Sequence, residues 1–177
     1  VINQYPPKVV RFWLVGTHYR NPISFGPEEL DTAARGLERL ETARFNWQHL
    51  LKQEVADGVS EPDALDAIKE RITRTREDFI AGMEDDFNTP QALSSLYELV
   101  REVNRWTQGQ QFRLTAAARE VLGSALEMLD LLGGEILGLF YEAEDAAAPA
   151  LTEADIEALI AQRTKAKKDK NWSLADQ

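Results

Sequence analysis

Apolar residues recur at steps of three, four and seven through most of the chain, and this helical period constrains the fold more than any other feature. No stretch shows a convincing alternation of apolar and polar residues, the pattern typical of a half-buried strand. The sequence therefore predicts an all-α fold, an antiparallel bundle of amphipathic helices joined by short loops. The buried stripes expected on four helices are Leu30, Ala33, Leu37, Leu40, Trp47 and Leu51; Leu65, Ile68, Ile72, Phe79 and Met83; Leu93, Leu96, Tyr97, Val100 and Val103; and Val121, Leu122, Ala125, Leu129 and Leu132.

Capping residues and prolines mark where these helices begin. Gly133 and Gly134 predict a break or kink in the last helix, after which the apolar residues 136–141 are expected to continue as helix. Residues 8–17 fit a strand or a short buried helix by pattern alone, and the helical patterns elsewhere favour a helix. The expected helix starts are Pro27 followed by Glu28 and Glu29, the capping pair Ser60 and Asp63, Thr89 before Pro90, and Thr115.

Residues 142–150, EAEDAAAPA, contain no large apolar side chain and are predicted to be a linker. Beyond it, Thr152 and Asp155 form a capping box that begins another helix. The chain begins without an initiator methionine, so we expect it to be part of a longer protein. The expected segments are 1–26, a bundle over 27–141, a linker over 142–151, and a final helical segment over 152–177.

Composition excludes several classes of site. The chain has no cysteine, which excludes disulfides, Cys-ligated zinc and thiol catalysis within it. Its net charge of −10 argues against a broadly basic nucleic-acid surface, so any contact with phosphates must be local. No stretch approaches the roughly 20 consecutive apolar residues of a membrane span. We expect a soluble, cytoplasmic protein that binds neither DNA nor membranes.

The acidic run Glu84-Asp85-Asp86 has two interpretations. Carboxylates bind Mg²⁺ and Ca²⁺, but a calcium loop spaces its ligands at alternate positions, whereas adjacent acids point in different directions. Acids just before Pro90 also lie near the start of a helix, where the helix dipole favours negative charge. We therefore predict a junction between two helices rather than a metal or catalytic site.

Histidine is scarce, because the chain has only His18 and His49, which are far apart in the sequence. Without cysteine they do not make a zinc site of the usual composition. His18 could act as a base or contact a phosphate, but a lone histidine beside Tyr19 and an apolar segment is more often packed and hydrogen-bonded. We find no glycine-rich phosphate loop and no nucleophile elbow, so we predict no catalytic residue, no metal and no cofactor in this chain.

The segment RTKAKKDKNW, residues 163–172, is the most suggestive polar stretch. Lysine and arginine neutralise phosphates, and an aromatic ring can stack on an unpaired base. Basic residues in the last turns of a helix also complement its dipole without any ligand, so the pattern alone leaves both interpretations open. The candidate side chains are Arg163, Lys165, Lys167, Lys168, Lys170 and Trp172.

Four stretches, taken in order, resemble the cysteinyl-tRNA synthetases, class I enzymes that join cysteine to its tRNA. They are VVRFWLVGTHYRNPISF at residues 9–25, MEDDFNTPQAL at 83–93, Val103-Asn104, and LIAQRTKAKKDKNWSLADQ at 159–177. Glu84 stands where the family usually has Asp. The family's nucleotide-binding fold, its signature loops and its zinc ligands lie upstream of such a segment and are not in this chain.

This resemblance implies that the parent protein is a cysteine–tRNA ligase that uses ATP and zinc, and that this chain follows its catalytic domain and is inactive alone. It implies a stem-contact end over 1–26, a DALR-type anticodon-binding bundle over 27–141, and the start of an anticodon-recognition module over 152–177. The implied partners are the tRNA for cysteine and the upstream catalytic domain of the same chain. The implied tRNA contacts are the six side chains of residues 163–172 and, on the acceptor side, His18, Tyr19 and Arg20.

Two other functions remain open. A related ligase that joins cysteine to an amino sugar–inositol shares the body plan but needs no anticodon module, so the resemblance after residue 159 speaks against it. A non-catalytic helical interaction module would bind a protein in an apolar groove, and tRNA would not displace that protein.

Overall fold

The computed structural model describes residues 5–58 and 61–140, all within the first of the two units into which the chain divides, Val1–Tyr141 and Glu142–Gln177. Every regular element in these residues is helical, which confirms the predicted all-α class. The helices are α1 (Pro7–Val15), α2 (Pro27–Leu51), α3 (Pro62–Glu84), α4 (Thr89–Thr107), α5 (Ala116–Leu129) and a π-helical extension of α5, η1 (Asp130–Ile136). None of the helices in the described range has the length and hydropathy to cross a membrane.

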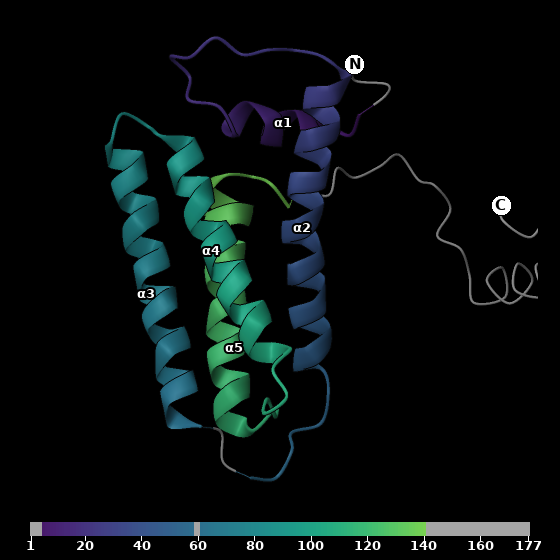
Figure 1. The fold of residues 1–177 in the computed structure, drawn as a ribbon, viewed down its shortest axis with the longest axis vertical. Coiled ribbons are helices and arrows are strands. Elements are labelled where there is room, and N and C mark those ends of the chain that lie inside the picture. Colours follow the sequence, from purple (N-terminus) through teal and green to yellow (C-terminus); the bar gives the residue numbers. More distant parts are fainter. Residues whose placement is uncertain (1–4, 59–60, 141–177) are drawn as a thin grey trace, which may run out of the picture. The chain divides into compact units, whose positions relative to one another are not determined.

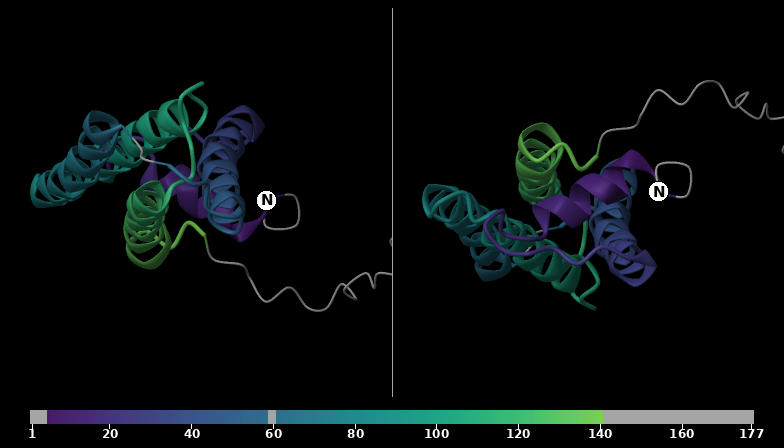
Figure 2. Two further views of the ribbon diagram at one scale, coloured as in Figure 1. Left: turned by 90° about the horizontal axis from the view of Figure 1, so that it is seen from below. Right: turned by 90° about the horizontal axis from the view of Figure 1, so that it is seen from above.

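The long helices α2 to α5 run alternately up and down, so each is antiparallel to the next (Figure 1). Helices α4 and α5 lie between α3 and α2 (Figure 1). The short helix α1 crosses one end of the bundle, and residues 16–26 pass over the same end to reach the start of α2 (Figure 2). This end therefore brings together α1, residues 16–26 and the corner between α3 and α4.

The core forms where the predicted apolar stripes meet. Leu40, Leu96 and Leu122, from three different helices, are each 0% exposed. Trp47 of α2 is buried among them, and its indole Nε1 donates a hydrogen bond to Asn104 Oδ1 of α4 at 2.8 Å. This bond satisfies the one polar atom of the indole, so the ring is buried without an unpaired donor.

Residues 8–17, for which a strand and a helix were both considered, are helical as far as Val15. Proline occupies the first turn of α1, where its missing N–H costs nothing. Ion pairs and hydrogen bonds hold α1 in place: Lys8 Nζ lies 2.6 Å from Glu41 Oε1 of α2, and Arg11 Nη1 donates to the Gly138 carbonyl at 2.6 Å. The N-terminal helix is thus attached both to α2 and to the chain that follows η1.

One of the predicted helix starts needs correction. Asn88, rather than Thr89, caps α4, because its side chain accepts a hydrogen bond from the Gln91 N–H at 3.3 Å. The Thr89 hydroxyl is instead occupied by the Val15 carbonyl, to which it donates at 2.7 Å. The predicted cap Ser60 lies outside the described residues, while the Thr115 start is confirmed by its hydrogen bond from Ala118 N.

The glycine pair does not break the last helix where expected. The chain continues through Gly133 and Gly134 as wider π turns, with Leu137 N donating to Leu132 O at 3.1 Å. A Cβ on Gly133 would lie 2.9 Å from the Phe140 ring, so glycine lets this ring fold back against the helix. The helix ends at Ile136, shortly before Gly138, whose φ of 63° favours glycine. The expected helical continuation over 136–141 is therefore wrong for residues 137–140.

Candidate nucleic-acid interface

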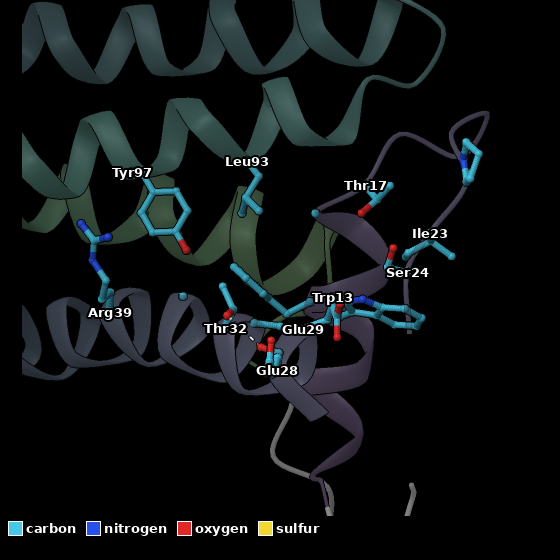
Figure 3. A pocket seen from close by; sticks show the side chains of 15 residues that line it. Trp13, Thr17, Ile23, Ser24, Glu28, Glu29, Thr32, Arg39, Leu93 and Tyr97 are labelled. Carbon is cyan, nitrogen blue, oxygen red and sulfur yellow. Dashed lines mark hydrogen bonds between the residues drawn. The ribbon is translucent and has the colours of Figure 1, made fainter. Parts of the chain in front are cut away.

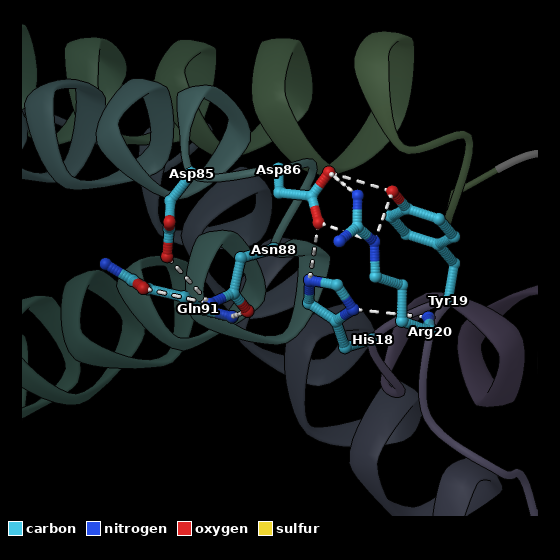
Figure 4. Close-up of polar contacts among 7 residues, drawn as sticks. All are labelled: His18, Tyr19, Arg20, Asp85, Asp86, Asn88 and Gln91. Atoms are coloured by element: carbon cyan, nitrogen blue, oxygen red, sulfur yellow. Dashed lines mark hydrogen bonds and ion pairs between the residues drawn. The ribbon is translucent and has the colours of Figure 1, made fainter.

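The carboxylate of Asp86, at the corner between α3 and α4, gathers the three side chains predicted to lie on the acceptor side (Figure 4). Tyr19 Oη donates to Asp86 Oδ1 at 2.8 Å, and Arg20 Nη2 donates to the same oxygen at 3.1 Å. Arg20 Nε lies 2.9 Å from Asp86 Oδ2, and His18 Nε2 lies 3.9 Å from it. We call this group of four side chains the Asp86 clamp.

Residues 18–20 also contact one another, through ring stacking, a cation–π contact and a backbone hydrogen bond. The His18 and Tyr19 rings stack with centroids 5.1 Å apart, and the Arg20 guanidinium lies 5.5 Å from the Tyr19 centroid. His18 Nδ1 accepts a hydrogen bond from the Arg20 N–H at 3.3 Å, so the neutral ring carries its proton on Nε2, the nitrogen that faces Asp86. The histidine is therefore a packed, hydrogen-bonded residue in this arrangement.

The corner itself has an uncommon backbone. Asp86 and Phe87 both adopt left-handed conformations, with φ of 54° and 53°, and the Phe87 side chain is exposed. Such values are uncommon for residues other than glycine, and bulky residues adopt them only when the surroundings compensate. The hydrogen bonds from Asn88 N to Gly82 O at 2.9 Å and from Phe87 N to Met83 O at 3.1 Å close the corner.

The acidic run thus has the structural role predicted for it, but with a partner that the sequence did not indicate. Asp86 pairs with Arg20, which is distant in the chain, and Asp85 is near the side-chain amide of Asn88, with Asp85 Oδ2 3.4 Å from Nδ2. Among residues 5–58 and 61–140 no cluster of three or more His, Cys, Asp or Glu side chains could hold a metal ion.

A cavity of about 700 Å³ is lined by residues of α1, α2, α4 and the segment 16–26 (Figure 3). Trp13 contributes an aromatic wall and packs edge to face on Phe25, with ring centroids 5.4 Å apart. Glu28 and Glu29 also line the cavity, so its wall repels phosphates. This cavity is therefore a poor site for nucleic acid.

Tyr97 of α4 and Arg39 of α2 lie at the far end of the same cavity (Figure 3). The Arg39 guanidinium carbon is 5.4 Å from the Tyr97 ring centroid, within the range of a cation–π contact. Burial raises the pKa of Tyr97 above its ordinary value of 10.0, and the positive charge of Arg39 opposes part of this rise.

Other arginines near this point were not selected from the sequence. Arg101 and Arg105 lie one helical turn apart on α4, and both line a groove that Arg39 also borders. The sequence gives one indication of them, a four-residue spacing that places two arginines on one face of a helix. Arg35 and Arg39 have this spacing, and so do Arg101 and Arg105. Such pairs are common on solvated helices, and only the packing of α2 beside α4 brings the two faces together.

The basic candidates of the C-terminal segment lie outside the described residues. They are Arg163, Lys165, Lys167, Lys168, Lys170 and Trp172. Their contact with RNA stays a prediction, as does the acceptor-side role of His18, Tyr19 and Arg20.

Comparison with known proteins shows what this chain is similar to. Residues 78–141, from the end of α3 through η1, match the DALR domain. A cysteine–tRNA ligase of Shouchella clausii is 38% identical over 177 residues, which is 100% of this chain and 35% of that protein. Cysteine–tRNA ligases of Halalkalibacterium halodurans and Moorella thermoacetica are 36% and 35% identical over 99% of this chain, which spans 34% and 37% of their lengths. Residues 78–141 therefore match the DALR domain, and the whole chain is similar to a segment that makes up about a third of the length of each of these cysteine–tRNA ligases.

Proposed function

We propose that the parent protein is an ATP-dependent cysteine–tRNA ligase and that this chain is the segment that positions the tRNA. The observation that carries the proposal is the continuous similarity to a protein of that name, 38% identity over 100% of the chain. A shared helical fold alone would not support it, since bundles of this kind serve many functions.

The mechanism proposed for the segment is geometric. The long antiparallel helices and their common core make a stiff body, and the Asp86 clamp fixes residues 16–26 on one end of it. A stiff body keeps the catalytic site and the anticodon reader at a set separation, so the acceptor end of the tRNA reaches the active site only when the other end is engaged.

Two groups of residues would contact the tRNA. The basic side chains Arg163, Lys165, Lys167, Lys168 and Lys170 would neutralise phosphates near the anticodon arm, with Trp172 available to stack on a base. His18, Tyr19 and Arg20 would face the acceptor side. The Arg20 side chain is 66% exposed, so it can meet a phosphate while Asp86 orients its guanidinium from behind.

ATP and zinc would act in the remainder of the parent protein. This chain has no cysteine, and the described residues offer no cluster of metal ligands. We propose the tRNA for cysteine and the catalytic domain of the same protein as partners, and the cytoplasm as the location.

A filter-binding titration of the chain with the tRNA for cysteine tests the proposal, with a non-cognate tRNA and a salt series as comparisons. We expect selective binding whose affinity falls as salt rises, because counterions are released from the phosphates. Reversing two charges, as in Lys167→Glu with Lys168→Glu, should weaken binding and flatten its salt dependence.

Two results would argue against the proposal. Equal affinity for cognate and non-cognate tRNA would remove the assigned specificity. The interaction-module alternative would be favoured by two observations together: the chain binds no tRNA at low salt, and it binds another protein that tRNA does not displace.

A further inference from the structure

A groove of about 640 Å³ between α2 and α4 is lined mainly by hydrogen-bond donors. Its floor contains the buried residues Ala43 and Val100 and the half-buried ring of Tyr97. Three arginines border it, Arg39 from α2 and Arg101 and Arg105 from α4, and we call it the arginine groove.

Two of these arginines have no acidic partner among residues 5–58 and 61–140. Arg39 lies against the face of the Tyr97 ring, which leaves the N–H groups at the edge of its guanidinium available. Arg105 is exposed, and neither it nor Arg39 has a carboxylate within ion-pair distance in the part of the chain that the structure describes. Both charges are therefore available to a ligand.

The third arginine is engaged within its own helix. Arg101 Nη2 forms an ion pair with Glu98 and lies 3.9 Å from Glu102 Oε1. The acid that lines the groove itself is Glu38, which is exposed and precedes Arg39 in the sequence. Arg101 is thus a weaker candidate for binding an anion, and Glu38 opposes such binding.

Neutral donors complete the lining. The Asn104 amide oxygen accepts from the Trp47 indole at 2.8 Å, which fixes the side chain and leaves the amide NH₂ as a donor toward the groove. Gln108, exposed at the end of α4, adds a second amide, and Thr42 adds a hydroxyl. The same indole bond holds α2 and α4 together, so the groove is formed before any ligand arrives.

A ligand that suits this lining carries negative charge, accepts hydrogen bonds and is extended along the helices. A sugar–phosphate backbone has these properties, and its oxygens are acceptors for arginine and amide donors. Tyr97 is the aromatic residue of the lining, and Arg39 lies over one of its faces, so a base does not stack on that face. We propose that the arginine groove binds the phosphate backbone of the tRNA, through Arg39 and Arg105, without reading its sequence. This inference rests on the proposed function, because it names where the same tRNA touches the bundle.

The test measures binding of the tRNA for cysteine to the full 177-residue chain and to three variants over a salt series. In the groove variant, Arg39→Gln with Arg105→Gln, we expect affinity to fall about tenfold or more at low salt. The slope of log K against log salt should decrease by about two, roughly one for each phosphate that is no longer neutralised. The matched control is Arg74→Gln with Arg76→Gln on α3, which removes the same charge away from the groove and should change the slope little.

The third variant is expected to bind tRNA more tightly than the wild-type chain, a result that misfolding would not produce. Glu38→Gln removes the opposing carboxylate and should strengthen binding at low salt. If the wild-type chain binds tRNA but the groove and control variants weaken it equally, the inference is wrong and the proposed function stands. If the wild-type chain binds no tRNA at low salt, both are wrong.

Discussion

At the scale of single residues, the Asp86 carboxylate connects the corner between α3 and α4 to Tyr19 and Arg20, which are more than 60 residues away in the sequence. It accepts from Tyr19 and pairs with Arg20, and its own backbone adopts a left-handed φ of 54° that Asp and Asn tolerate better than other residues. Asp86→Asn keeps this backbone preference, removes the charge and replaces one acceptor oxygen by an NH₂ donor. We expect a loss of about 1 kcal/mol or less in the free energy of unfolding, since both partners are partly exposed.

The local effect of the same substitution should be larger than the global one. With Arg20 released, trypsin should cut the bond between Arg20 and Asn21 several times faster, as measured by mass spectrometry of the product that begins at Asn21. The control is Asp85→Asn, which changes a side chain that accepts a hydrogen bond from Asn88 and should leave that rate unchanged. Equal cleavage in the two variants would show that the clamp does not hold residues 16–26.

Tyr97 provides a prediction about alkaline pH. Because its pKa is raised by burial, the folded chain keeps the phenol proton at pH values where the unfolded chain has lost it. The free energy of unfolding should therefore fall as pH rises above 10.0, the ordinary value for tyrosine. Urea unfolding at several pH values should show a smaller fall in Tyr97→Phe, and an unchanged fall would contradict the assignment to this residue.

At the scale of helices, the approach of α3 to α4 depends on one glycine. A Cβ at Gly82 would lie 2.9 Å from Ala92 N and 3.3 Å from Asn88 O, which are backbone atoms at the start of α4. Gly82→Ala should cost about 1–3 kcal/mol through overpacking, even though alanine favours helix. Gly123→Ala is the control on α5, where no heavy atom lies within 4 Å of the added Cβ, and it should stabilise by about 0.5–1 kcal/mol. Urea melts that gave both variants the same sign would contradict this account.

The sequence predicted the helices far better than their ends or their partners. Apolar spacing identified the stripe from Leu93 to Val103, because helical period is a local property. It could not distinguish Asn88 from Thr89 as the cap, since that choice depends on whether Val15 takes the threonine hydroxyl. For the same reason it missed the pairing of Asp86 with Arg20 and the position of Arg39 and Arg105 on the same groove. Both depend on how the helices pack.

At the scale of the whole chain, truncation after Tyr141 is predicted to make the net charge less negative and yet to weaken the binding of tRNA. Truncation after Tyr141 removes five basic and eight acidic side chains, so the shorter chain is less acidic than the full one. If tRNA bound through the overall field, the truncated chain would bind more tightly. We expect weaker binding with a smaller salt slope, because the truncated chain lacks Arg163, Lys165, Lys167, Lys168 and Lys170 and keeps only the arginine groove. Circular dichroism must first show that the truncated chain keeps its helices. Tighter binding by a folded truncated chain would mean that the C-terminal segment repels tRNA, and would make the groove the main site of tRNA binding.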